Sequence, residues 1–422
     1  MKPDESPYTT LRTPAVFVVW MLTVHCLIAG PAADWPQFLG PQRNGTYSGP
    51  PLARAWPKDG PPVLWKRDVG AGFAGPAVSN DRLILFHRLD DQAVVECLEA
   101  RTGKEIWKAA YPTDYQDDFG FDNGPRATPA VADGRVFTFG AEGALNCWNL
   151  TNGLKLWGID TAKEFVTGKG FFGRAASPLV WSNLVILTIG GRAGAGIVAF
   201  DVASGKVSWK ATDDEASYSS PIVTSINGQT YLLALTREAL VCLRPTDGLI
   251  RFRYPWRPPM NASVTSATPL IVDDLIFLSA SYGAGARLLR FKENGPELIW
   301  SKDDVLSNHY ATSVQRNGFL FGWHGRQEQG CDFRCVELKT GKVRWTQSGL
   351  KAGTVTLVGN ELLLLTERGE LLRLPAAPDG FKPTARVQVL PTEVRASPAL
   401  ANGLFYGRSE KRLVCLDLTR EQ

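Results

Sequence analysis

The chain has few of the residues and motifs that usually carry enzymatic chemistry. Histidine occurs only four times in 422 residues, at His25, His87, His309 and His324, and no pair of them has metal-ligand spacing. The sequence contains no GxSxG, HExxH or P-loop motif and no CxxCH haem-attachment motif. These absences argue against the common serine and zinc hydrolases, P-loop enzymes and covalent haem proteins. We expect each histidine to be a surface or packed residue rather than a ligand.

An excess of charge of one sign is also missing. The chain carries 46 Lys and Arg against 42 Asp and Glu, for a net charge of +4, and has no Lys/Arg cluster. This balance predicts that nucleic acid is not a partner. Hydrophobic residues make up 44% and charged residues 21%, which is typical of a globular protein. The 41 glycines and 28 prolines indicate many turns, as an all-β fold needs.

The apolar run at residues 15–30 is shorter than the ~20 residues of a membrane-spanning helix. It follows a polar segment containing basic residues and precedes small residues, which predicts a signal peptide over residues 1–33 with cleavage near Ala32 or Ala33. We therefore expect an exported protein, periplasmic or extracellular. Two alternatives stay open: an uncleaved signal anchor, which would associate the protein with a membrane, and a buried helix.

The sequence is rich in internal repeats. Residues 127–157 and 177–209 share a Ser/Thr-Pro step, short apolar strands, a glycine and a tryptophan. The position of the Ser/Thr-Pro step recurs about every 46 residues. This is the period of propeller blades that contain several short strands each. The pattern predicts an all-β, eight-bladed β-propeller of four-stranded antiparallel blades. The eight anchor positions are Pro76, Pro129, Pro178, Pro221, Pro269, Ser313, Val355 and Pro398.

A glycine and an aromatic residue close six of the copies in a nearly fixed register. The spacing from glycine to aromatic is four residues in five copies, and five residues between Gly295 and Trp300. Glycine tolerates the left-handed backbone that tight hairpins require. The four-residue pairs are Gly103 and Trp107, Gly153 and Trp157, Gly205 and Trp209, Gly248 and Phe252, and Gly341 and Trp345.

Cysteine follows the same register. Cys97, Cys147, Cys242 and Cys335 each lie ten residues before the aromatic, and Cys415 lies in a matching LVCL segment. Equivalent positions in neighbouring blades lie about 10 Å apart, beyond the ~7 Å reach of a disulfide. We therefore predict that these five are buried free thiols. Cys331 falls outside the register and lies too close along a strand to pair easily with Cys335.

The eighth copy lacks its outermost strand. It begins near Arg395 and ends near Leu418, whereas the segment Val63–Asp68 before the first copy looks like a surplus outer strand. An N-terminal strand that completes the last blade would remove the open edge of the ring. The predicted organisation is a signal peptide at 1–33, a Pro/Gly-rich leader at 34–61 and a propeller at 62–422.

The pattern Ala/Leu-x-Cys-Leu-x-Ala-x-Thr-Gly-Lys-x-x-Trp resembles the tryptophan-docking repeat of pyrroloquinoline-quinone (PQQ) propellers over roughly residues 62–418. The resemblance implies that the repeated tryptophan docks onto the next blade. Phe252 replaces it in the fourth copy, and the seventh copy has no aromatic. The matching residues are Trp65, Trp107, Trp157, Trp209, Trp300 and Trp345.

This family contains quinone-dependent dehydrogenases and also non-enzymatic propellers, such as the propeller of the β-barrel assembly machinery. The dehydrogenase branch implies adjacent cysteines over the cofactor and a calcium site of Glu, Asn and Asp, and we find neither pattern. We therefore favour a monomeric, non-catalytic binding or scaffold module without a cofactor, whose partner is a protein or small ligand. The alternative is a PQQ-dependent dehydrogenase with the quinone over the channel near Arg126, Arg174 and Arg395.

Long connections indicate where a ligand would bind, because long loops of compact folds tend to carry function. Residues 107–129 and 157–178 are the longest connections measured, and we expect them at the mouth of the ring. Arginine beside aromatic rings suits a planar anion or a carboxylate. The candidate mouth residues are Arg126, Phe171, Phe172, Arg174, Tyr218, His309, Tyr310 and Arg395.

The same loop offers a purely structural interpretation, which we rank first. Arg126 and Arg395 would pair with the acidic residues of the first loop; these are Asp114, Asp117, Asp118 and Asp122. The loop lacks DxDxDG spacing, so a calcium site is not predicted there. A polysaccharide-binding or -cleaving propeller using the aromatic mouth would show paired carboxylates about 5–9 Å apart.

Overall fold

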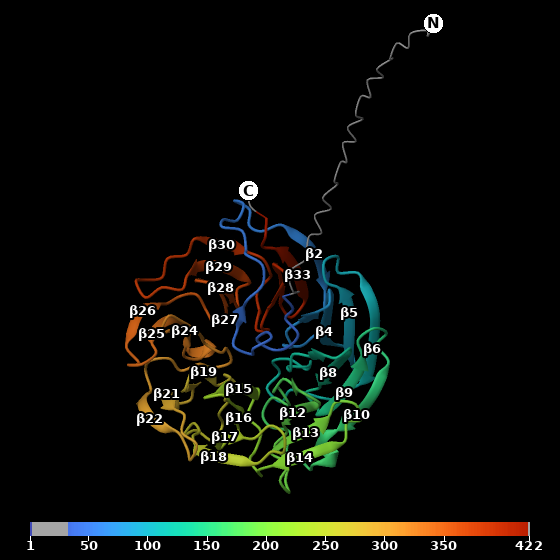
Figure 1. Ribbon diagram of the computed structural model, residues 1–422, viewed down its shortest axis with the longest axis vertical. Coiled ribbons are helices and arrows are strands. Elements are labelled where there is room, and N and C mark those ends of the chain that lie inside the picture. The colour runs from blue at the N-terminus through green and yellow to red at the C-terminus, as the bar shows by residue number, and fades with distance from the viewer. Residues whose placement is uncertain (2–32, 421–422) are drawn as a thin grey trace. The chain divides into compact units, whose positions relative to one another are not determined.

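The computed structural model describes residue 1 and residues 33–420, and within residues 33–420 eight β-sheets surround a common centre (Figure 1). This confirms the predicted all-β, eight-bladed propeller. Apart from Met1 and Ala33, the predicted signal peptide lies outside the described residues. No helix among the described residues is long and apolar enough to cross a bilayer.

Each blade begins with a short inner strand and ends with an outer strand. The first blade consists of β3 (Ala77–Ser79), β4 (Arg82–Leu89), β5 (Gln92–Glu99) and β6 (Glu105–Pro112), and the second of β7 (Ala130–Ala132), β8 (Arg135–Phe139), β9 (Ala144–Asn149) and β10 (Lys155–Asp160). The third blade consists of β11 (Leu179–Trp181), β12 (Leu184–Thr188), β13 (Ile197–Asp201) and β14 (Val207–Ala211), and the fourth of β15 (Ile222–Ile226), β16 (Gln229–Leu235), β17 (Ala239–Leu243) and β18 (Ile250–Pro255).

The next two blades have the same order, the seventh gains a fifth strand and the eighth is completed from the N-terminal side. The fifth blade consists of β19 (Leu270–Val272), β20 (Leu275–Ala280), β21 (Gly285–Arg290) and β22 (Glu297–Lys302), and the sixth of β23 (Val314–Arg316), β24 (Phe319–His324), β25 (Asp332–Glu337) and β26 (Val343–Gln347). The seventh blade consists of β1 (Thr46–Tyr47), β27 (Gly353–Val358), β28 (Glu361–Thr366), β29 (Glu370–Pro375) and β30 (Ala385–Gln388). The eighth consists of β31 (Ala399–Ala401), β32 (Leu404–Arg408), β33 (Arg412–Asp417) and β2 (Val63–Asp68).

The ring closes as the sequence predicts. Strand β2 pairs antiparallel with β33, with Trp65 opposite Cys415, so the segment before the first blade becomes the outer strand of the eighth (Figure 1). The pairing satisfies the backbone groups at the edge of β33, which an open blade would expose. The two ends of the propeller thus hold each other in one sheet.

Six tryptophans carry the contact between neighbouring blades. Each indole N–H donates to a backbone carbonyl of the following blade; the pairs are Trp65 to Ala100 (3.0 Å), Trp107 to Leu150 (2.8 Å), Trp157 to Val202 (3.0 Å), Trp209 to Pro245 (3.0 Å), Trp300 to Leu338 (2.9 Å) and Trp345 to Ala377 (2.9 Å). For five of the six tryptophans, a hairpin glycine of the following blade lies under the ring. Gly153 has φ of 72°, and a Cβ there would lie 2.5 Å from the Trp107 ring. Glycine is therefore required for both its backbone conformation and its size.

The Ser/Thr before the anchor proline links inner strands around the channel. The hydroxyl of Thr128 accepts the N–H of Gly75 at 3.2 Å, Ser177 accepts that of Thr128 at 2.9 Å, and Ser220 accepts that of Ser177 at 2.9 Å. These backbone groups are buried and would otherwise lack a partner, which costs free energy. A hydroxyl at this position therefore joins the inner strands of the first four blades in succession.

The leader crosses the channel. The main chain of Trp35 pairs with Val78 of the first blade, and Thr46 pairs with Leu357 of the seventh. Between them, the buried Arg43 guanidinium donates to the carbonyls of Ser177 and Pro178, at the start of the third blade. The third and seventh blades face each other in a ring of eight, so a segment that contacts both must pass through the centre. The leader thus spans the channel from the first blade to the seventh.

The cysteines confirm the predicted free thiols. All six among the described residues are unpaired and buried: Cys97, Cys147, Cys242, Cys331, Cys335 and Cys415. Burial raises the pKa of the Cys97 thiol to about 11 and that of Cys415 to about 12. A thiol that stays protonated is a poor nucleophile and metal ligand, so these residues act as small core hydrophobes.

Candidate functional site: an aromatic cup at one mouth of the ring

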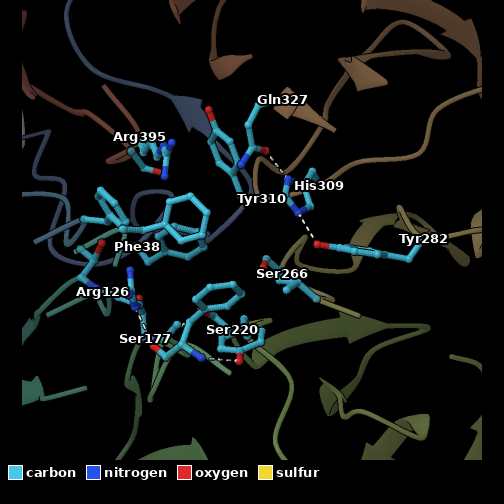
Figure 2. Close-up of a pocket in the computed structure, with 18 of the residues that line it drawn as sticks. Phe38, Arg126, Ser177, Ser220, Ser266, Tyr282, His309, Tyr310, Gln327 and Arg395 are labelled. Carbon is cyan, nitrogen blue, oxygen red and sulfur yellow. Dashed lines mark hydrogen bonds between the residues drawn. The ribbon is translucent and has the colours of Figure 1, made fainter. Parts of the chain in front are cut away.

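A cavity of about 210 Å³ opens at the end of the channel where the inner strands begin. Its walls come from one position of the repeat, three residues before the anchor, in seven of the eight blades: Phe73, Arg126, Ala175, Tyr218, Ser266, Tyr310 and Arg395. Loops and the leader add Phe38, Phe121, Phe172, Tyr282, His309, Gln327 and Glu328. Figure 2 shows side chains of this set lying around a common space. We call this cavity the cup.

The leader supplies part of the cup. Phe38 lies in the segment that crosses the channel, and its side chain lines the cup (Figure 2). This residue is fixed by its neighbours: Trp35 is buried and pairs with the first blade, and Arg43 is anchored on the third. The site therefore depends on a segment that precedes the repeats in sequence.

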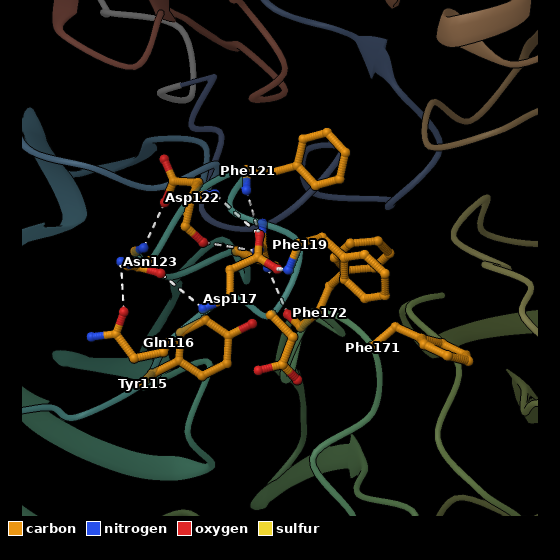
Figure 3. A network of polar contacts seen from close by, with 12 residues as sticks. Tyr115, Gln116, Asp117, Phe119, Phe121, Asp122, Asn123, Phe171 and Phe172 are labelled. Atoms are coloured by element: carbon orange, nitrogen blue, oxygen red, sulfur yellow. Dashed lines mark hydrogen bonds and ion pairs between the residues drawn. The ribbon is translucent and has the colours of Figure 1, made fainter.

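Asp117 organises the wall between the first two blades (Figure 3). Its fully buried carboxylate accepts the backbone N–H groups of Phe119, Phe121 and Asp122, each at 3.1 Å. It also pairs with Arg126 at 3.0 Å. A buried carboxylate with four donors folds the loop around itself, which places the Phe119 and Phe121 rings against Phe172 at 5.1 and 5.9 Å between centroids.

The two arginines of the cup are held differently. Arg126 is committed to the wall, because it also donates to the carbonyls of Phe172 at 2.6 Å and Asp122 at 2.9 Å. Arg395 is held less tightly, with Nε 3.4 Å from Glu367 and 27% of its side chain exposed. Both guanidinium groups lie over the Phe73 ring, at 5.1 and 5.3 Å from its centroid. Two guanidinium groups over one aromatic ring form a surface that combines apolar contact with positive charge.

Part of the predicted charge network is wrong. Arg126 pairs with an acidic residue of the first loop, as expected, but Arg395 pairs with Glu367, which lies after β28 of the seventh blade. Tyr310 donates a hydrogen bond to the same carboxylate at 3.1 Å. The channel brings these three residues together, and their separation in sequence gave no sign of it. Glu367 is therefore the acidic partner at the far wall.

Both ring nitrogens of His309 are occupied. Nδ1 bonds to Gln327 Oε1, and Nε2 accepts from the hydroxyl of Tyr282 at 2.9 Å (Figure 2). Burial lowers the pKa of His309, so the neutral form is favoured. Burial likewise raises the pKa of Tyr282. A histidine bonded on both sides orients the wall and is poorly placed to take a proton from a substrate.

Six of the eight predicted mouth residues line the cup: Arg126, Phe172, Tyr218, His309, Tyr310 and Arg395. The other two, Phe171 and Arg174, line a second cavity beside it, between the third and fourth blades. Sequence reasoning missed Phe38, Phe73 and Tyr282. Phe73 shares the register of Arg126 and Tyr218, so a scan of the position three before each anchor would have found it. No repeat signal marks the other two, which come from the leader and a turn.

The cup does not fit a calcium-assisted quinone site of the kind that the dehydrogenase resemblance implies. Its lining contains a single carboxylate, Glu328, beside two arginines. Among residues 33–420, no three His, Cys, Asp or Glu side chains are grouped so that they could hold a metal ion. Calcium needs several oxygen ligands, with carboxylates among them. A single carboxylate in the lining also does not fit the carboxylate pair of a glycosidase.

One histidine outside the cup makes stability depend on pH. Burial lowers the pKa of His324 to about 4 from its usual 6.5, while Nδ1 accepts the N–H of Ser307 at 3.1 Å. Between these values the unfolded chain binds a proton that the folded protein does not, so the free energy of unfolding falls as pH drops from 6.5 to 4. We expect a loss on the order of 2 kcal/mol from this residue, after allowing for partial exposure.

Urea denaturation at pH 7 and at pH 4.5 measures this loss. The control is His324→Asn, whose amide oxygen can accept the same N–H without titrating. A pH dependence that is just as steep in this variant would contradict the assignment to His324.

The fold and the cup define this protein as an eight-bladed propeller whose channel is crossed by its own leader and has one mouth lined by aromatic residues and arginine. The PQQ_2 family model, described as outer membrane protein assembly factor BamB, matches residues 90–347. This match covers more than half of the chain, and the chain belongs to that family. No curated protein matches the sequence significantly.

Solved structures show the same fold at low sequence identity. BamB from Moraxella catarrhalis is 14% identical with a TM-score of 0.62, covering 86% of this chain and 98% of its own. Quinohemoprotein alcohol dehydrogenase from Comamonas testosteroni is 14% identical with a TM-score of 0.65, covering 92% and 81%. A computationally designed protein, Ika8, is 10% identical with a TM-score of 0.57, covering 84% and 99%. An assembly factor, an enzyme and a design share the architecture, so the fold alone does not assign a function.

Proposed function

We propose that this protein is an exported, non-catalytic binding module that holds a small ligand or a segment of a partner protein in the cup. The observation that carries the proposal is the lining itself. Seven aromatic rings and two arginines surround one preformed space, and the only histidine in it is bonded on both ring nitrogens. Binding sites are characteristically concave and mostly apolar, with a few placed polar groups.

The rigidity of the wall supports binding rather than chemistry. Arg126 and Asp117 satisfy each other, and burial raises the pKa of Tyr310 and Tyr218, which keeps both hydroxyls protonated. A protonated phenol donates or accepts hydrogen bonds but is not a base. Aromatic side chains that are held in place recognise a ligand at a low entropic cost.

A photo-crosslinking amino acid at Phe121 tests the location of binding. This residue lines the cup and is 50% exposed, whereas Ile106 on outer strand β6 is 45% exposed and far from the mouth in the blade. With the full chain produced in its exporting host, we expect covalent adducts at position 121 and few at position 106. The mass of the adduct distinguishes a small ligand from a protein. Equal labelling at both positions would mean that the cup is not the binding site.

The alternative, a PQQ-dependent dehydrogenase, is favoured by one observation: Arg126 and Arg395 both cover Phe73, a seat that suits a planar anion. Titration of the protein with pyrroloquinoline quinone, with and without Ca²⁺, separates the two proposals. At 100 times its Kd a ligand stabilises the fold by about 2.7 kcal/mol, which a thermal shift detects. Calcium-dependent binding that Arg126→Ala and Arg395→Ala both abolish, with dye-linked turnover of an alcohol or sugar, would overturn the binding-module proposal.

A further inference from the structure

The second cavity, about 800 Å³ in volume, lies beside the cup between the third and fourth blades. The connections 166–176 and 213–218 form most of its walls, and Thr188, Ile189 and Gly190 lie where β12 ends. Tyr218 separates it from the cup, since this residue lines both cavities and its hydroxyl accepts the N–H groups of Phe171 and Phe172 at 3.0 Å each. Its lining is therefore largely distinct from that of the cup.

Arg174 lines this cavity and has no acidic partner among residues 33–420. The residue is 5% exposed, and its guanidinium donates only to neutral oxygens, the carbonyl of Lys169 at 3.2 Å and the hydroxyl of Thr167. Its Nε has no hydrogen-bond acceptor among the described residues. Buried charges are normally paired, because an unpaired one loses hydration without compensation. Arg126, by contrast, is buried to a similar degree and has the Asp117 carboxylate.

The other charges of the cavity leave this positive charge unmatched. Glu215 is paired with Arg237 at 3.2 Å, and Asp213 accepts the N–H of Gly194 at 2.7 Å. Arg192 at the cavity is exposed and has no ion-pair partner within the described part of the chain. Three arginines therefore face two carboxylates, and of the two arginines without an ion-pair partner among the described residues, Arg174 is the buried one. Phe171, under the Arg237 guanidinium at 5.4 Å, adds an aromatic wall.

We propose that this cavity is a second binding site, which takes a small organic anion whose carboxylate or phosphate group pairs with Arg174. The volume exceeds what the charged group alone needs, so the rest of the ligand lies along Phe171 and Ile189. Arginine binds both types of anion through its planar set of donors. This site is independent of the function proposed for the cup.

Isothermal titration calorimetry of the full chain at low ionic strength tests the proposal with inorganic phosphate and with citrate as probes. We expect saturable binding of at least one probe to the wild type, and binding that is at least about tenfold weaker in Arg174→Gln, because a charge-assisted hydrogen bond is lost. Arg251→Gln is the matched control: it removes the same charge from exposed outer strand β18, away from the cavity, and should bind like the wild type.

Two further variants keep the result interpretable. Arg192→Gln changes an exposed side chain, so it tests the site even if Arg174→Gln does not fold, and it should weaken binding several-fold. Arg395→Gln alters the cup and should leave probe binding unchanged. The proposal is overturned if neither probe binds saturably, or if Arg251→Gln loses as much affinity as the cavity variants. It is also overturned if Arg395→Gln loses affinity for the probe while the cavity variants bind normally, because the anion would then bind in the cup.

Discussion

Replacing Asp117 with Ala is expected to destabilise the propeller by about 3–5 kcal/mol, which is a large effect for a single loop residue. The carboxylate is completely buried and accepts three backbone N–H groups as well as Arg126. Its removal leaves the Arg126 side chain, only 8% exposed, without a counter-charge. Urea denaturation followed by tryptophan fluorescence measures the change.

The neighbouring residue provides the control for this prediction. Asp118 is 61% exposed and pairs with Lys169, so Asp118→Ala should change stability by no more than about 1 kcal/mol. If the unpaired arginine causes most of the loss, adding Arg126→Met to Asp117→Ala should restore part of the stability. Equal effects of Asp117→Ala and Asp118→Ala would show that the buried network does not hold the loop.

The same variant links the loop to the proposed function. Phe121 and Phe172 reach the cup through contacts that the Asp117 carboxylate fixes, since it binds the backbone N–H of Phe121 and the arginine that holds the carbonyl of Phe172. Crosslinking at position 121 should therefore fall in Asp117→Ala under conditions where the ring remains folded. The network that we ranked first as purely structural thus builds the wall of the candidate site.

The sequence predicted those features that repeat. Blade number, the hairpin glycines and the closing strand follow from periodicity, because most blades repeat the same local features. These are a hydroxyl that joins inner strands, a glycine under a tryptophan, and an outer strand that covers an edge. The strand Val63–Asp68 could be assigned to the eighth blade because that blade lacked one. A missing part in a regular pattern identifies its replacement even at a separation of more than 300 residues.

The features that occur once were not predictable in this way. Arg43 donates to carbonyls more than 130 residues away, and Glu367 joins Arg395 and Tyr310 across the mouth. Neither contact belongs to the repeat, so only the closed ring brings the residues together. The leader was predicted as a separate Pro/Gly-rich segment, but the structure shows that it crosses the channel and contributes Phe38 to the cup. What distinguishes this propeller from others of its fold therefore lies outside the repeated positions.

The repeated positions themselves should be unusually intolerant of one added methyl group. We expect Gly153→Ala to destabilise the protein by about 2–5 kcal/mol, from two causes. A left-handed conformation at a residue with Cβ costs about 1–2 kcal/mol. The new Cβ would also lie 2.5 Å from Cε3 of Trp107, and relieving such a contact in a packed interface costs a further ~1–3 kcal/mol.

A second glycine of the same blade separates the two causes. Gly134 has φ of 70°, nearly that of Gly153, but nothing lies within 4 Å of the position where its Cβ would be. Gly134→Ala should therefore show the backbone cost alone, and the difference between the variants measures the contact with Trp107. In a Trp107→Ala background that difference should vanish, because the ring is no longer there. If it persists, the glycine is needed for backbone conformation only, and the tryptophan does not dock against it as the structure describes.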